Sequence, residues 1–161
     1  MIDATAGNGH DTLFLAQCVG PEGRVLAFDV QEAALVSARS RVEKMPWVEF
    51  FHQSHREMAA HAENGSVAAV MFNLGYLPGE NHELTTEADE TLGALEIAVR
   101  LLKPGGLLSV VCYPGHPAGA REALAVEQWM SALAAMGCRV ARYGALGTRR
   151  PAPFLLLAGK G

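Results

Sequence analysis

Apolar positions along the chain fall into short runs, separated by longer segments in which apolar residues recur at helical spacing. The short runs predict strands at residues 1–3, 24–29, 48–52, 67–72, 107–112, 139–143 and 154–158. The longer segments predict helices at residues 11–19, 31–44, 58–63, 86–102 and 119–136. Strands and helices therefore alternate until the last two strands, which follow one another.

This alternation predicts an α/β domain with a mostly parallel, doubly wound sheet. The run at 67–72 is nearly all apolar, which is typical of a parallel strand buried on both faces. The chain has 161 residues, the size of about one domain, and shows no linker, repeat or low-complexity segment. We therefore expect a single domain over residues 1–161.

Composition excludes several classes of protein. No apolar run approaches the ~20 residues that a membrane helix needs, so we expect no membrane partner. Met1 leads almost directly into a glycine loop, so we expect no signal peptide and a cytoplasmic location. Cys18, Cys112 and Cys138 are far apart and odd in number, which favours reduced structural thiols. The histidines lack the spacing of a zinc site, so we expect no metal.

The net charge of −4 is unusual for a protein that binds nucleic acid by bulk electrostatics. Any RNA contact would have to come from a local patch. The best candidate is the group Arg139, Arg142, Arg149 and Arg150 near the C-terminus, although these side chains could equally form an ordinary solvated face.

The residues from Asp3 to Thr12 read as a strand end, a tight turn and a helix start. Gly7 and Gly9 can adopt positive φ, and the N-terminus of the helix favours a carboxylate or a phosphate. A dinucleotide fingerprint needs a third glycine where the chain has Thr12. An acid, small residues and G-x-G fit a turn that binds S-adenosylmethionine better. The alternative is an ordinary turn with glycines for geometry alone.

Asp29 ends the second predicted strand, 20 residues beyond Gly9. In a βαβ unit such an acid lies beside the first loop and accepts hydrogen bonds from ribose hydroxyls. Capping of the next helix is a compatible alternative. Ser54 and His55 follow the third strand and could flank an adenine, or Ser54 could cap a helix.

Three blocks together resemble a known family. Asp3 to Thr12, Asn73 to Gly79 and Tyr113 to Pro117 are similar to the signature blocks of the bacterial "putative rRNA methylase" family, in order and over nearly the whole chain. The resemblance implies a Rossmann-like class I methyltransferase, with a seven-stranded sheet, an antiparallel last strand and S-adenosyl-L-methionine as methyl donor. The candidate cofactor-binding residues are Asp3, Ala4, Thr5, Gly7, Asn8, Gly9, Asp11, Thr12, Asp29, Gln31, Ser54, His55 and Asn73.

The resemblance also implies a substrate. Members of the family have been linked to tRNA, with N-methylation of the 5-aminomethyl group of wobble 2-thiouridine. Other substrates (rRNA, a small amine or a protein) remain alternatives, and a homodimer is a further expectation. The family usually has residues before the first strand that cover the cofactor, and we expect this cover to be missing because Met1 lies inside the strand.

Asn73 to Tyr76 resembles the Asn-Pro-Pro-Tyr loop of amino-group methyltransferases, which favours a nitrogen acceptor. Asn73 would orient the amine, or else only form a turn. An alkyl amine has a pKa of ~10, so the site must remove its proton, and His116 is the candidate helper or else a structural residue. Tyr76 could contact the base or pack the loop.

Two other classes of function compete with this hypothesis. A nicotinamide-dependent oxidoreductase would need the third glycine and a second domain. A non-catalytic RNA-binding module would not need Asp29 or Asn73, and both are present.

Overall fold

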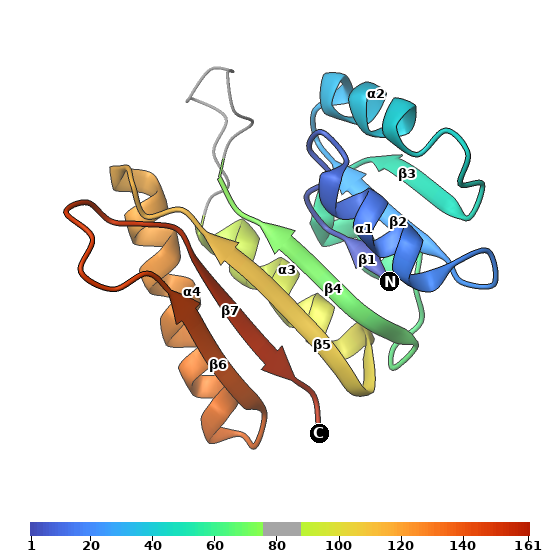
Figure 1. The fold of residues 1–161 in the computed structure, drawn as a ribbon. Coiled ribbons are helices and arrows are strands. Elements are labelled where there is room, and N and C mark those ends of the chain that lie inside the picture. The colour runs from blue at the N-terminus through green and yellow to red at the C-terminus, as the bar shows by residue number, and fades with distance from the viewer. Residues whose placement is uncertain (76–87) are drawn as a thin grey trace.

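The computed structural model describes residues 1–75 and 88–161, which form a seven-stranded sheet flanked by helices (Figure 1). The strands are β1 (Ile2–Asp3), β2 (Val25–Asp29), β3 (Val48–His52), β4 (Val67–Asn73), β5 (Leu102–Cys112), β6 (Arg139–Gly144) and β7 (Phe154–Gly159). The helices are α1 (His10–Val19), α2 (Glu32–Arg41), the 3₁₀ helix η1 (His55–Ala60), α3 (Ala88–Leu101) and α4 (Pro117–Ala135).

The strand order is β3-β2-β1-β4-β5-β7-β6. Strands β1 to β5 pair in parallel, whereas β7 pairs antiparallel with both β5 and β6. The expected seven-stranded sheet with an antiparallel last strand is thus confirmed. The carboxyl ends of β1 to β6 all lie at one edge of the sheet, which we call the carboxyl rim.

Helices cover both faces of the sheet. α1 and α2 contact β1, β2 and β3, whereas α3 and α4 lie behind β4, β5 and β7 in Figure 1. Side chains of β2 alternate between the two layers, because successive residues of a strand point to opposite faces. Ala27 packs with Leu35 of α2, and Phe28 packs in the large cluster that includes Phe72 and Leu95. The doubly wound arrangement therefore follows from two separate apolar layers.

The structure corrects several predicted boundaries. The third helical segment begins at His55 rather than at residue 58, because the Ser54 side chain accepts a hydrogen bond from the Arg56 N–H at 3.2 Å. β5 begins at Leu102, whereas the sequence predicted a helix through residue 102 and a strand only from residue 107. Leu102 pairs with Val67 before a register shift, so the strand is irregular there. The predicted start of the helix at 86–102 lies outside the described residues.

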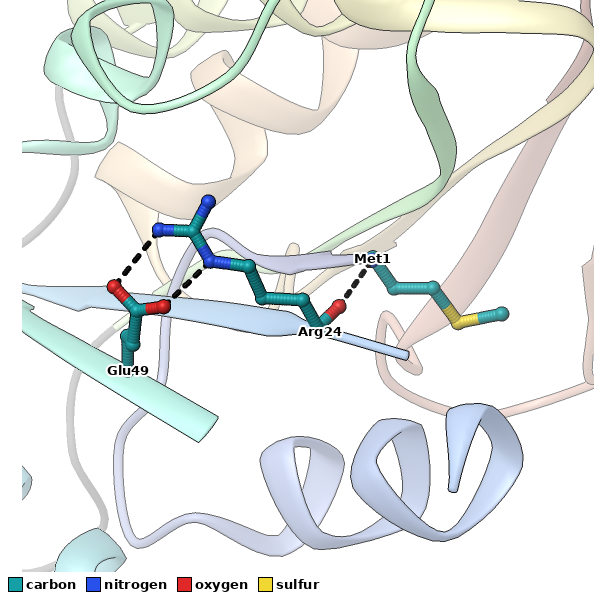
Figure 2. Close-up of polar contacts among 3 residues, drawn as sticks. All are labelled: Met1, Arg24 and Glu49. Atoms are coloured by element: carbon teal, nitrogen blue, oxygen red, sulfur yellow. Dashed lines mark hydrogen bonds and ion pairs between the residues drawn. The ribbon is translucent and has the colours of Figure 1, made fainter. Parts of the chain in front are cut away.

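At the amino-terminal edge of the sheet, opposite the carboxyl rim, an ion pair links the segment before β2 to β3. Figure 2 shows Arg24, just before β2, bonding the Glu49 carboxylate of β3 with Nε at 2.5 Å and Nη2 at 2.8 Å. The Arg24 carbonyl accepts a hydrogen bond from the Met1 amine at 2.7 Å. Because both charged side chains are about half exposed, this pair contributes little to stability. No helix in the described part of the chain is long and apolar enough to cross a membrane.

The start of α1 packs directly on α2. Gly9 has a φ of 79°, and a Cβ built on it would lie 2.6 Å from the Cα of Ala38. Only glycine allows both the positive φ and the close approach of α1 to α2, because any side chain would strain the backbone and push the two helices apart.

Replacing Gly9 with Ala should therefore destabilise the fold more than the same change at a glycine with open space. Gly65 is the matched control, because its φ is 73° and nothing lies within 4 Å of a built Cβ. Gly65→Ala should cost about 1 kcal/mol of backbone strain, and Gly9→Ala roughly 1–3 kcal/mol more from overpacking. Urea unfolding measures both values, and equal destabilisation by the two changes would contradict the packing argument.

Candidate functional site at the carboxyl rim

The site is built around the point where the strand order reverses. β1 lies between β2 and β4, so the loops that follow these strands open a crevice at the rim, where α/β proteins bind ligands. The loop after β1 turns through Gly7 and Gly9, with φ of 48° and 79°. The N-cap residue of α1, Gly9, has no side chain that could cap the helix, so the first N–H groups of α1 can serve a bound anion.

Asp29 ties this loop to the next βα unit. Its Oδ2 accepts a hydrogen bond from the Gly7 N–H at 2.8 Å, and its Oδ1 accepts one from the Gln31 N–H at 2.9 Å. Gln31, not Asp29, is the N-cap residue of α2. Each carboxylate oxygen can accept a second hydrogen bond. Asp29 can therefore hold the loop and accept bonds from ligand hydroxyls at the same time.

Asp3 lies beneath the loop, with 1% of its surface exposed. Its carboxyl group accepts hydrogen bonds from the Thr12 hydroxyl at 2.5 Å and the Thr5 N–H at 3.2 Å. Burial raises the pKa of Asp3 to about 7, aided by the charges of Asp11 and Asp29. Ala4, Gly9 and Thr12 are buried too. Together with Asp3, these predicted cofactor-binding residues support the loop from the protein interior.

The predicted adenine-side residues have structural partners. Ser54 caps η1, which is the alternative that the sequence left open for this residue. The His55 ring packs against Phe72, with ring centroids 5.5 Å apart, and hydrogen-bonds the backbone of Ala4. Burial lowers the pKa of His55, so the ring is neutral at neutral pH. A contact of either residue with an adenine stays a prediction.

Asn73, at the end of β4, is joined to the glycine loop. Its N–H donates to Thr5 Oγ1 at 2.7 Å, and its Nδ2 donates to Asp11 Oδ2 at 3.2 Å. Its side chain also hydrogen-bonds Tyr113, the residue that follows β5. These bonds bring together three segments that are far apart in the sequence. Because Nδ2 is held by Asp11, Oδ1 is the amide atom that can accept a hydrogen bond from a substrate.

Tyr113 lies in the candidate site, although the sequence indicated it only as part of the block Tyr113 to Pro117 and gave it no role of its own. Its ring lies against Gly75, where a built Cβ would be 3.7 Å from Tyr113 Cδ2. Burial raises the pKa of Tyr113, and its hydrogen bond with Asn73 opposes that shift. The available signal was its position directly after the predicted strand 107–112, at the same edge as Asn73.

His116 has a structural role in this structure. Its Nδ1 accepts a hydrogen bond from the Gly119 N–H at 3.1 Å and so caps α4. Help with a substrate proton stays a prediction for His116. Tyr76, the other predicted catalytic residue, lies outside the described residues.

Other parts of the structure offer weaker sites. Burial raises the pKa of the Cys112 thiol to about 12, so this cysteine is protonated and unreactive at neutral pH. A hollow of about 520 Å³ lies at the opposite edge, beside Met1, Arg24 and residues 59–63. It lies away from the strand carboxyl ends, where the polar groups of the rim converge. Among residues 1–75 and 88–161, no group of three or more His, Cys, Asp or Glu side chains could hold a metal ion.

Comparisons with known proteins agree with this fold. Residues 25–159 match the family described as "Putative rRNA methylase". The chain is 43% identical over 145 residues to a chloroplastic tRNA (mnm⁵s²U34)-methyltransferase of Arabidopsis thaliana, covering 83% of this chain and 53% of that protein. The chain thus spans about half the length of this curated relative, and less than half the length of the other curated relatives that it matches.

Solved structures give the same result. A putative rRNA methylase from Clostridium thermocellum superposes with a TM-score of 0.92 at 34% identity, over 99% of this chain and 87% of that one. A putative methyltransferase from Streptococcus mutans, solved in complex with SAH, gives a TM-score of 0.87 at 32% identity, over 99% and 86%.

The fold is that of a class I methyltransferase: it has the sheet order of that class, an antiparallel β7, a glycine loop after β1 and an acid at the end of β2. Within that class, the chain belongs to the putative rRNA methylase family. The residues present also suit the methyl donor of the class. Asp29 retains acceptor capacity for ribose hydroxyls, and the uncapped start of α1 offers N–H groups to a carboxylate.

The buried Asp3 should make stability depend on pH. Its pKa is about 7 in the folded protein, against 3.8 as the ordinary value. Between these values the folded state binds more protons than the unfolded state, so stability falls as pH rises. The free energy of unfolding of the parent, relative to that of Asp3→Asn, should decrease from about pH 4 to about pH 7 and then stay level. Urea unfolding across this range checks the difference, and a constant difference would contradict the raised pKa.

Proposed function

We propose that this protein is an S-adenosylmethionine-dependent RNA methyltransferase that methylates an amino group, most specifically the 5-aminomethyl group of wobble 2-thiouridine in tRNA. The single observation that carries the proposal is the Asn73 network. It places a fixed amide oxygen between the glycine loop and the β5 end, at the rim where a methyl donor would bind.

The donor's ribose would bind to Asp29, and its carboxylate to the N–H groups at the start of α1. The support for this assignment is the geometry of the two groups and the SAH complex of the Streptococcus mutans relative, which covers 99% of this chain. When bound, S-adenosylmethionine supplies an activated methyl group on a positively charged sulfur. The carboxylates of Asp11 and Asp29 favour a cation at this place.

The side chains at the rim suit a nitrogen acceptor. The Oδ1 atom of Asn73 can accept one N–H of a neutral amine and so hold its lone pair in a fixed direction. An alkyl amine is protonated at neutral pH, with a pKa of ~10, so it must lose a proton before it attacks. A route through a cysteine nucleophile is disfavoured, because the Cys112 thiol has a pKa of about 12.

The substrate is proposed from the 43% identity to the Arabidopsis tRNA (mnm⁵s²U34)-methyltransferase. The family description names rRNA instead, which makes rRNA the second candidate. Both substrates are RNA, so the two candidates differ in the target nucleotide and share the rim chemistry.

The ribose assignment can be tested separately from catalysis. Calorimetry should compare S-adenosylhomocysteine with an analogue that lacks the ribose hydroxyls, on the parent and on Asp29→Asn. Removing a hydrogen bond to a charged group costs about 1.5–3 kcal/mol, so the parent should bind the deoxy analogue roughly ten- to a hundredfold more weakly. In Asp29→Asn this difference should shrink, because the charged acceptor is already absent. An unchanged difference would remove Asp29 from the ribose site.

The reaction is tested by incubating the protein with S-adenosylmethionine and tRNA that carries 5-aminomethyl-2-thiouridine, followed by nucleoside mass spectrometry. We expect the methylated nucleoside from tRNA, and none from matched amounts of rRNA or small amines. Asn73→Ala should lower kcat by at least about tenfold while S-adenosylhomocysteine affinity stays within about twofold, since its oxygen acts only on the amine.

The control for this experiment is Ser131→Ala, which removes a hydroxyl from the exposed side of α4 and should leave both values unchanged. Methylation of rRNA alone would favour the second candidate. Equal turnover by Asn73→Ala and the parent would end the proposed role of Asn73.

A further inference from the structure

The four arginines that the sequence grouped into one patch are separated in the structure. Arg139 begins β6 and pairs with Gly159, at the amino-terminal edge of the sheet. Arg142 is neutralised, because its Nε lies 2.7 Å from Glu127 Oε1 and its guanidinium carbon lies 4.1 Å from the centre of the Phe154 ring. Neither side chain is therefore a free positive group beside the site.

Arg149 and Arg150 occupy a different place. They lie in the connection between β6 and β7, and β6 runs in the same direction as β1 to β5. The connection therefore reaches the carboxyl rim, at the end of the sheet where β5 finishes in Figure 1. The Pro151 carbonyl oxygen lies 4.0 Å from a Cβ built on Gly115, so this connection lies beside the loop that follows Tyr113.

The local sequence restricts the conformation of this connection. Gly147 has a φ of 69°, which allows the chain to turn, and prolines stand at 151 and 153. Proline fixes its own φ and disfavours helical backbone at the preceding residue, so Arg150 has fewer accessible conformations. Arg149 and Arg150 are both exposed. The two guanidinium groups are thus presented on a short, stiffened segment rather than on a freely moving tail.

Charge is divided along the rim. Asp11 and Asp29 lie on the side of the glycine loop, whereas Glu127 of α4 is paired with Arg142. Within the described residues, neither Arg149 nor Arg150 forms an ion pair. In a chain of net charge −4, this pair is a local positive spot on the Tyr113 side of the rim.

We propose that Arg149 and Arg150 bind backbone phosphates of the RNA strand next to the target nucleotide, and so guide that nucleotide past the Tyr113 loop to Asn73. This inference rests on the proposed function and adds the surface where the RNA docks. Guanidinium groups pair with phosphate through two parallel hydrogen bonds, and phosphate contacts position a strand without reading its sequence. An exposed single-stranded loop suits the site, because its unstacked nucleotides can be turned toward an enzyme.

The test measures binding of a fluorescent anticodon stem-loop RNA by anisotropy at several salt concentrations, without a methyl donor. The double variant Arg149→Ala/Arg150→Ala should bind several-fold more weakly. The slope of log affinity against log salt should fall by roughly 0.7 for each single-strand phosphate that no longer has a guanidinium partner. Arg149→Lys/Arg150→Lys should keep most of the slope, since the charge is retained.

The matched control is Arg100→Ala/Arg139→Ala, which removes the same charge from the end of α3 and the start of β6, at the far edge of the sheet. Its salt slope should stay close to that of the parent. Equal slopes for the two alanine pairs, or no RNA binding by the parent, would overturn the inference.

Steady-state methylation separates this inference from the proposed function. The Arg149→Ala/Arg150→Ala variant should raise the KM for tRNA while kcat at saturating tRNA and the affinity for S-adenosylhomocysteine stay unchanged. A parent that binds the stem-loop through these arginines but methylates no RNA would end the proposed function and leave the docking surface in place. If the parent methylates tRNA and the double variant has the same KM for tRNA, the proposed function stands and the docking surface is ruled out.

Discussion

The carboxylate of Asp29 is the constraint on which the rest of the rim depends. One side chain accepts the Gly7 N–H and the Gln31 N–H, and so joins the loop after β1 to the start of the next helix. Buried or half-buried N–H groups in a loop need partners, and here an acid at the end of β2 supplies them. The Gly9–Ala38 contact then sets how closely α1 packs on α2. With the loop held in this way, Thr5 and Asp11 can position Asn73.

The rim combines charges of opposite sign in separate places. Three carboxyl groups lie around the glycine loop. Burial raises the pKa of Asp3, the charges of Asp11 and Asp29 add to that rise, and the acids together favour cationic ligands such as a sulfonium or an amine. Arg149 and Arg150 stand on the other side of Tyr113, in the connection between β6 and β7. Under the proposed function, this division would let one edge of an acidic protein bind a cationic methyl donor and a polyanionic RNA, because the two charges would meet different groups.

Sequence patterns predicted the fold well because each signal was local. Apolar runs and helical spacing located the seven strands and the helices between them, and the strand alternation predicted which sheet edge carries the site. The glycine loop and Asp29 were also found, since a βαβ unit brings them together through short-range geometry. Other expectations depended on packing. Ser54 and His116 act as caps, and Asp3 lies buried rather than at the surface of the crevice, because the loop folds over it.

By itself, the sequence determined the alternation of elements, the glycine turn and the acid beside it, because these depend on residues within a single βαβ unit. Only the tertiary structure decided that Tyr113 bonds Asn73, and that Arg149 and Arg150 reach the rim while Arg139 lies at the far edge. The physical reason is strand direction. Arg139 and Arg149 are ten positions apart in the sequence but lie at opposite ends of the sheet, and residues distant in the sequence meet wherever parallel strands end together.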